Sequence, residues 1–219
     1  MVIVSISRVF HYGTVLNSLP PLLVKAMKIL VNLFHPDLAQ STVNRRWAQA
    51  LKEHPEITLN IPYERYPDWR IDVEREQALL LAHDRIVFQH PFYWYSSPPL
   101  TKKWVDEVLS FGWAYGPGGT QLAGKEWVSA ISTGGPADSY QAGGYNRYSM
   151  SELLKPMQAT ANLIGMTYLP AFVLHGVIVA SPQEIDQSAS AYLAHIQDPE
   201  LNPAVKQARL LEEFSDDSE

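Results

Sequence analysis

The amino-acid sequence predicts an α/β fold, with a five-stranded parallel sheet of strand order 2-1-3-4-5 and helices on both faces. From residue 27 onward, short β-rich runs alternate with longer helical patterns, as in consecutive βαβ units. The run Asp84-Arg-Ile-Val-Phe-Gln89 has an apolar centre, which is typical of a strand covered on both faces. Five such units suit a doubly wound sheet, in which ligands bind beyond the carboxyl ends of the strands.

The first half of this pattern holds three strands and two helices. We expect strands at 28–34, 56–61 and 84–89, helices at 41–53 and 73–82, and a loop at 62–71. Ser41 and Asp72 stand at the start of the two helical patterns, where their side chains suit an N-cap.

The second half continues with a glycine-rich loop, further helices and two strands. We expect helices at 98–110, 150–165 and 181–196, strands at 126–133 and 168–175, and the loop at 112–124. Pro98 and Pro99 suit a first helical turn, where the missing N–H costs nothing. Gly165 suits a helix stop, and Ser181 suits a cap.

The length of 219 residues favours one domain, which we place at 27–198. Apolar residues make up 46% of the chain, an ordinary share for a globular protein. An acidic tail at 199–219 ends in Ser-Asp-Asp-Ser-Glu and is expected to fray. The chain has no cysteine, which excludes disulfides and cysteine nucleophiles and fits a reducing cytoplasm.

Residues 1–26 are an N-terminal extension of a different character. The stretch is apolar, but Arg8, His11 and Asn17 interrupt it and Pro20-Pro21 ends it. It lacks both the length of a membrane span and the pattern of a signal peptide. We expect the natural start to be Met27, and a weakly structured extension is the alternative.

Charge and motif patterns exclude several classes of function. The formal net charge is -6, with no basic stripe, so we expect no nucleic-acid partner. The seven histidines show no zincin spacing, and we expect no metal site. The chain has no Gly-x-Ser-x-Gly elbow, no Walker loop and no Gly-x-Gly-x-x-Gly after the first strand.

Three loops at the expected carboxyl edge of the sheet carry the chemistry. Ser41, Thr42 and Asn44 follow the first strand at a helix start, which suits a phosphate, although plain capping is the alternative. Four consecutive aromatic residues at 92–95 follow the third strand and suit a flat ring system or a dimer interface. Gly134 and Gly135 follow the fourth strand and let backbone approach a ligand, or form a simple turn.

Together these segments resemble the NAD(P)H dehydrogenase (quinone) family, whose fold is flavodoxin-like. The matching segments are His35-Pro with Ser41-Thr-Val-Asn44, Gln89-His-Pro-Phe-Tyr-Trp-Tyr-Ser-Ser-Pro-Pro-Leu100, Gly112-Trp-Ala-Tyr-Gly116 and Ser132-Thr-Gly-Gly135. The segments Tyr66-Pro-Asp-Trp-Arg-Ile-Asp72 and Asn146-Arg-Tyr-Ser-Met-Ser-Glu-Leu-Leu154 are most similar to ancillary flavoproteins of glutathione-gated potassium efflux systems. The resemblance spans about residues 27–176.

The resemblance implies a non-covalent flavin, FMN or alternatively FAD, with NAD(P)H as co-substrate. The residues that would hold its phosphate are His35, Ser41, Thr42, Val43 and Asn44. Those that would line its ring are Phe92, Tyr93, Trp94, Tyr95, Ser132, Thr133, Gly134 and Gly135. Tyr140 would lie at the N1–C2 edge as the catalytic residue, and Asn146 stands where family members often carry a histidine. Trp113 and Tyr115 would line the acceptor pocket at a homodimer interface.

The implied activity is two-electron transfer from NAD(P)H through the flavin to a quinone or related acceptor, in a cytoplasmic enzyme. The alternative is a regulatory ancillary subunit, docked on a potassium efflux antiporter at the cytoplasmic side of the inner membrane. A one-electron flavodoxin carrier is a third interpretation, which the mild acidity and the 112–124 loop disfavour.

Overall fold

The computed structural model of the chain describes residues 27–216, so the expectations for residues 1–26 lie outside the described part. Its strands are β1 (Ile29–Leu33), β2 (Ile57–Asn60), β3 (Arg85–Pro91), β4 (Glu126–Ser132), β5 (Thr167–Tyr168) and β6 (Phe172–Leu174). Its α-helices are α1 (Val43–Leu51), α2 (Pro62–Arg65), α3 (Val73–Ala82), α4 (Pro99–Val108), α5 (Met150–Leu153), α6 (Lys155–Leu163), α7 (Pro182–Gln197) and α8 (Pro203–Asp216). Within residues 27–216 no helix is long and apolar enough to cross a membrane.

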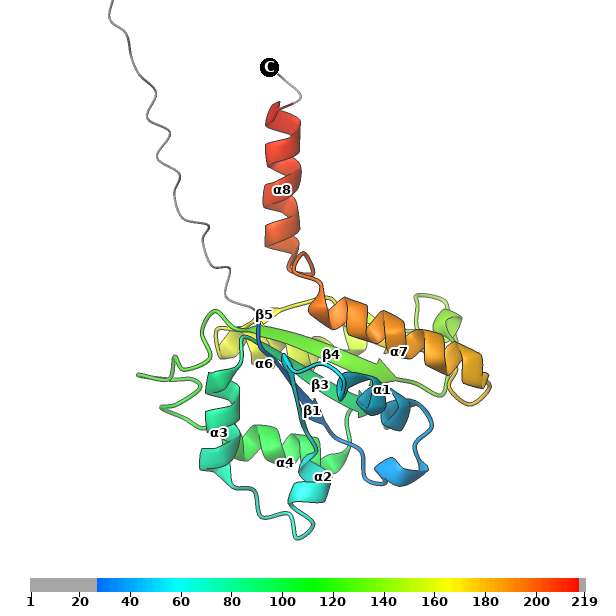
Figure 1. The fold of residues 1–219 in the computed structure, drawn as a ribbon, viewed down its shortest axis with the longest axis horizontal. Coiled ribbons are helices and arrows are strands. Elements are labelled where there is room, and N and C mark those ends of the chain that lie inside the picture. Colours follow the sequence, from blue (N-terminus) through cyan, green and yellow to red (C-terminus); the bar gives the residue numbers. More distant parts are fainter. Residues whose placement is uncertain (1–26, 217–219) are drawn as a thin grey trace, which may run out of the picture.

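The strands form one parallel sheet of order β2-β1-β3-β4-β5, which confirms the predicted topology (Figure 1). The register aligns Val31 with Val87 and Val87 with Val128 across the centre. All residues of β1 and β3 are buried, as expected for strands covered on both faces.

Two apolar clusters lie on opposite faces of the sheet. On one face, α1 and α7 pack through Trp47 and Tyr192, whose ring centroids are 4.8 Å apart. On the other face, α3, α4 and α6 cover a cluster that includes Trp104 and Trp127. The Trp127 ring stacks on Phe88 at 3.9 Å between centroids.

Four expectations about single elements were wrong. The predicted fifth strand is two short strands, β5 and β6, because Pro170 between them has no N–H to donate to the sheet. The predicted helix at 150–165 breaks at Leu154, just before Pro156. The loop at 62–71 contains α2, and the tail expected to fray forms α8, which projects from the sheet in Figure 1.

Buried Arg85, at the amino end of β3, holds the end of the last sheet-packed helix. Its guanidinium pairs with Glu126 at 2.8 Å and donates to the carbonyl oxygens of Ile196 and Asp198 at 2.6 and 2.9 Å. A cation suits the free carbonyls at a helix C-terminus. Leu201 also joins the core, so packing extends beyond the boundary placed at 198.

A fully buried carboxylate, Glu76 on α3, is surrounded by donors. It accepts hydrogen bonds from Trp104 Nε1 at 2.8 Å, Asn60 Nδ2 at 2.8 Å and the Tyr66 hydroxyl at 2.7 Å, and it pairs with Arg75. Burial, followed by the hydrogen bond to Glu76, raises the pKa of Tyr66 to about 12, so its hydroxyl remains a donor. This cluster ties α3 and α4 to the carboxyl end of β2.

We expect Glu76→Ala to lower the free energy of unfolding by about 3 kcal/mol, because several buried donors lose their common acceptor. Urea denaturation measures the change. Glu74→Ala is the matched control, since Glu74 lies in the same first turn of α3 but is exposed. It should cost no more than about 0.5 kcal/mol. Equal losses in the two variants would contradict this account of Glu76.

Candidate active site

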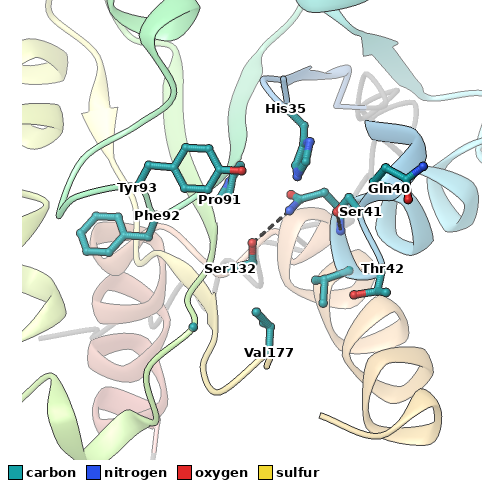
Figure 2. Close-up of a pocket in the computed structure, with 12 residues that line it drawn as sticks. His35, Gln40, Ser41, Thr42, Pro91, Phe92, Tyr93, Ser132 and Val177 are labelled. Carbon is teal, nitrogen blue, oxygen red and sulfur yellow. Dashed lines mark hydrogen bonds between the residues drawn. The ribbon is translucent and has the colours of Figure 1, made fainter. Parts of the chain in front are cut away.

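A cavity of about 410 Å³ opens at the carboxyl edge of the sheet, between the loops that follow β1, β3 and β4. Figure 2 shows the residues that line it: His35, Gln40, Ser41, Thr42, Val43, Asn44, Pro91, Phe92, Tyr93, Ser132, Gly134 and Val177. None of these twelve side chains is a carboxylate. Sequence reasoning missed Gln40, Pro91 and Val177, whose side chains carry no distinctive chemistry.

The start of helix α1 forms one end of the cavity. Ser41 Oγ accepts the backbone N–H of Asn44 at 3.0 Å, which is the capping bond predicted from the sequence. Thr42 borders the cavity and makes no side-chain capping bond of its own. The first N–H groups of a helix lack intrahelical partners, and together with the helix dipole they favour an anion.

His35 adds a neutral donor at the same end. Its Nδ1 accepts the backbone N–H of Asp37 at 3.1 Å, so the neutral ring carries its proton on Nε2. Burial lowers the pKa of His35 below its usual value, and nearby Asp37 opposes this only in part. Near neutral pH the ring therefore offers an uncharged N–H donor.

A buried hydrogen-bond network positions this end of the cavity. Gln89 Nε2, on β3, donates to the backbone oxygen of Asn44 at 3.1 Å and to its Oδ1 at 3.2 Å. The Tyr192 hydroxyl, on α7, donates to Gln89 Oε1 at 3.2 Å. Asn44 Nδ2 donates to Ser132 Oγ at 2.9 Å, the dashed line in Figure 2. Sequence reasoning missed Gln89 as a site residue, although an amide within an apolar strand was a usable signal.

The four aromatic residues after β3 divide into two pairs. Phe92 and Tyr93 line the cavity, whereas Trp94 is 93% exposed and Tyr95 is half exposed. The backbone turns tightly here, since Ser96 N–H donates to the Tyr93 carbonyl at 2.9 Å. Trp94 and Tyr95 consequently have φ of 49° and 60°, a costly conformation for bulky residues. The tight turn therefore separates Trp94 and Tyr95 from the two residues that line the cavity.

The loop after β4 forms the opposite wall. Buried Thr133 donates through Oγ1 to the Gly135 carbonyl at 2.9 Å. A methyl group on Gly135 would lie 3.2 Å from Cε2 of Tyr140, so the absence of a side chain lets that ring approach. The Tyr140 ring also packs edge-on against the Phe92 ring, with 6.2 Å between the ring centroids. Thr133, Gly135 and Tyr140 therefore support the cavity wall from behind.

The predicted pocket residues Trp113 and Tyr115 lie apart from this cavity. Asn146 and His175 make contacts that the sequence did not predict. Trp113 packs against the core on the α4 face. The Tyr115 ring packs edge-on against Phe111, with 5.6 Å between the ring centroids. Asn146 Oδ1 accepts the Tyr95 hydroxyl at 3.0 Å. His175, which sequence reasoning did not single out, contacts the Tyr140 ring at 5.2 Å between centroids.

The chain is similar to known proteins over most of its length. A family model described as Flavodoxin-like fold, Flavodoxin_2, matches residues 27–196. The uncharacterized NAD(P)H oxidoreductase YdeQ of Bacillus subtilis (strain 168) is 56% identical over 188 residues, which cover 86% of this chain and 95% of that protein. The glutathione-regulated potassium-efflux system ancillary protein KefG of Salmonella paratyphi B is 44% identical over 172 residues, covering 78% and 94%.

Solved structures with the same fold include two with related names. General stress protein 14 of Treponema denticola, in complex with FMN, is 43% identical with a TM-score of 0.74, covering 76% of this chain and 96% of that chain. An NADPH-quinone reductase from P. pentosaceus is 34% identical with a TM-score of 0.72, covering 78% and 98%.

We expect Gln89→Leu to weaken binding of an anionic ligand at this end of the cavity about tenfold, because Asn44 loses the amide donor that fixes it. The loss of buried partners should also lower the free energy of unfolding by about 2 kcal/mol. Titration with FMN and urea denaturation measure the two effects. Gln158→Leu, at an exposed position of α6, is the control and should change neither.

Proposed function

The chain belongs to the flavodoxin-like NAD(P)H oxidoreductase family, and from this we propose that it is an FMN-dependent NAD(P)H:quinone oxidoreductase. One observation carries the proposal. A single cavity joins an anion-binding helix start to a wall of aromatic rings and glycine backbone. FMN has a phosphate at one end and a flat ring system at the other, so its shape and charge match this cavity.

The donor set at the α1 end fits a phosphate. The helix start, the Thr42 hydroxyl and the Nε2–H of His35 are all donors, and no carboxylate among the lining residues repels an anion. Ser41 and Asn44 hold each other in place through the capping bond. We assign phosphate binding to His35 and to residues 41–44. The FMN bound to the Treponema relative supports FMN over FAD.

The opposite end fits a flat ring system. Phe92 and Tyr93 offer aromatic surface, and Gly134 leaves backbone exposed to a ligand. We assign the isoalloxazine ring to this end, lined by residues 92–95 and 132–135. Trp94 and Tyr95 would contribute from the rim, since they are exposed and do not line the cavity itself.

The proposed FMN cofactor determines the chemistry. Bound FMN would supply the redox chemistry, a two-electron hydride transfer from NAD(P)H to a quinone. The protein orients the ring, excludes water from its buried face and stabilises negative charge at its edge. We assign the last task to Tyr140, whose hydroxyl lies against Gly135 beside the proposed ring site.

The acceptor and the assembly are further parts of the proposal. Exposed apolar side chains occur on the loops that follow β3 and β6 at the cavity edge of the sheet; they include Trp94, Ile178 and Val179. Such exposure is typical of an interface. We propose a homodimer, in which Trp113 and Tyr115 line the acceptor pocket together with the partner. We place this enzyme in the cytoplasm.

A second role is favoured by one specific observation, the 44% identity with KefG, an ancillary protein of a potassium-efflux system. The chain would then dock on an antiporter at the cytoplasmic side of the inner membrane and regulate it. Co-purification with an antiporter from native membranes in mild detergent would support this role. Absence of association under those conditions would count against it.

We expect Tyr140→Phe to slow reduction of the protein-bound flavin by NAD(P)H about ten- to a hundredfold, because one charge-stabilising donor is lost. Stopped-flow absorbance measures the rate. Tyr145→Phe is the matched control, since this nearby tyrosine is 90% exposed, and its rate should equal that of the unmodified protein. An unchanged rate in Tyr140→Phe would remove the role assigned to Tyr140.

The function itself is tested on the purified protein by absorbance. We expect flavin bands that bleach when NADPH is added and return when a quinone is added. Cofactor released by denaturation identifies FMN or FAD. A colourless protein that takes up neither flavin would overturn the enzymatic proposal and leave the regulatory role first.

A further inference from the structure

His175 is held against the wall of the proposed flavin site by the backbone. It directly follows β6, and the flanking segment is bonded to the loop after β4. Thr133 N–H donates to the Leu174 carbonyl at 2.9 Å, Gly176 N–H to the Gly135 carbonyl at 2.8 Å and Val177 N–H to the Thr133 carbonyl at 3.0 Å. His175 therefore has little freedom to move away from Tyr140, which its ring contacts.

The hydrogen bonds of Thr133 determine which nitrogen of His175 carries the proton. The Thr133 hydroxyl has one proton, which it donates to the Gly135 carbonyl. Its oxygen can then only accept from His175 Nδ1, which lies 3.2 Å away. Neutral His175 thus carries its proton on Nδ1, and Nε2 is left as a free acceptor of a second proton.

The surroundings keep this ring neutral until negative charge forms nearby. Burial lowers the pKa of the half-buried His175, and among the described residues no charged group adds to or opposes this shift. The titratable group that faces the ring is Tyr140, from the loop after β4, while Thr133 and Gly135 present only neutral groups. The Asn146 amide accepts from Tyr95 and supplies no charge.

We propose that His175 is the charge-compensating partner of Tyr140, taking up a proton on Nε2 when negative charge accumulates at this wall of the cavity. The proposal rests on the function inferred above. If His175 took up no proton, two-electron reduction of the site would bring in one proton, from NAD(P)H. If His175 is protonated, a second proton comes from solvent to Nε2. The pair His175–Tyr140 then offers one cation and one hydroxyl donor beside the new charge.

The number of protons taken up sets the pH dependence of the midpoint potential of the FMN-loaded protein. Measured across about pH 6 to 8, where histidine titrates, the potential should fall with pH about twice as steeply in the unmodified protein as in His175→Gln. His54→Gln is the control, because His54 precedes β2 at the opposite edge of the sheet, and it should keep the steeper slope.

Equal slopes in the unmodified protein and His175→Gln would overturn the role of His175 and leave the oxidoreductase function intact. A protein that takes up no flavin would instead overturn the proposed function, because no negative charge would then form at the site for His175 to compensate. The two failures are therefore distinguishable.

A second measurement needs no variant. NMR titration of the His175 ring in the unmodified protein should show its proton affinity rising at least about a hundredfold when bound FMN is reduced, as uptake of one proton across about pH 6 to 8 requires. The ring of His54 should not change. A His175 titration that is the same with oxidised and reduced FMN would overturn the proposal.

Discussion

The carboxamide of Gln89 is the point on which the geometry of the candidate site depends. It lies in the middle of the sheet, where no water can satisfy it, and so it must bond to protein groups. Its partners are Asn44 at the start of α1 and Tyr192 on α7, and Asn44 in turn holds Ser132 at the end of β4. One buried side chain thereby fixes the helix start, the central strand and the glycine loop relative to one another.

Neutral donors characterise the electrostatics around this centre. The capped start of α1 and the Nε2–H of His35 meet the cavity without a full positive charge in contact. Such an arrangement suits an anion bound through dipoles and hydrogen bonds. Buried charged groups lie elsewhere: Arg85 donates to a carbonyl oxygen at the end of α7, and Glu76 on α3 accepts a hydrogen bond from Trp104 on α4.

Function in this family fold depends on details at the rim. Asn146, where the resemblance led us to expect a histidine, accepts a hydrogen bond from Tyr95 in the turn that has positive φ at Trp94 and Tyr95. His175 contacts Tyr140 from a different strand end. In the proposed mechanism, a charge partner for Tyr140 would be supplied from another loop of the same edge, because parallel strands bring all their carboxyl ends together.

The sequence by itself determined the layered fold, the strand order and the loops that meet at the cavity, because periodicity and capping are local signals. Ser41 and Asp72 cap helices as their positions indicated. Tertiary structure alone decided the split at Pro170, where a lost donor matters only against β4, and the pairing of His175 with Tyr140. It also separated Phe92 and Tyr93, which line the cavity, from Trp94, which is exposed to solvent. Such choices depend on which distant groups become neighbours, and no local pattern in the chain encodes that.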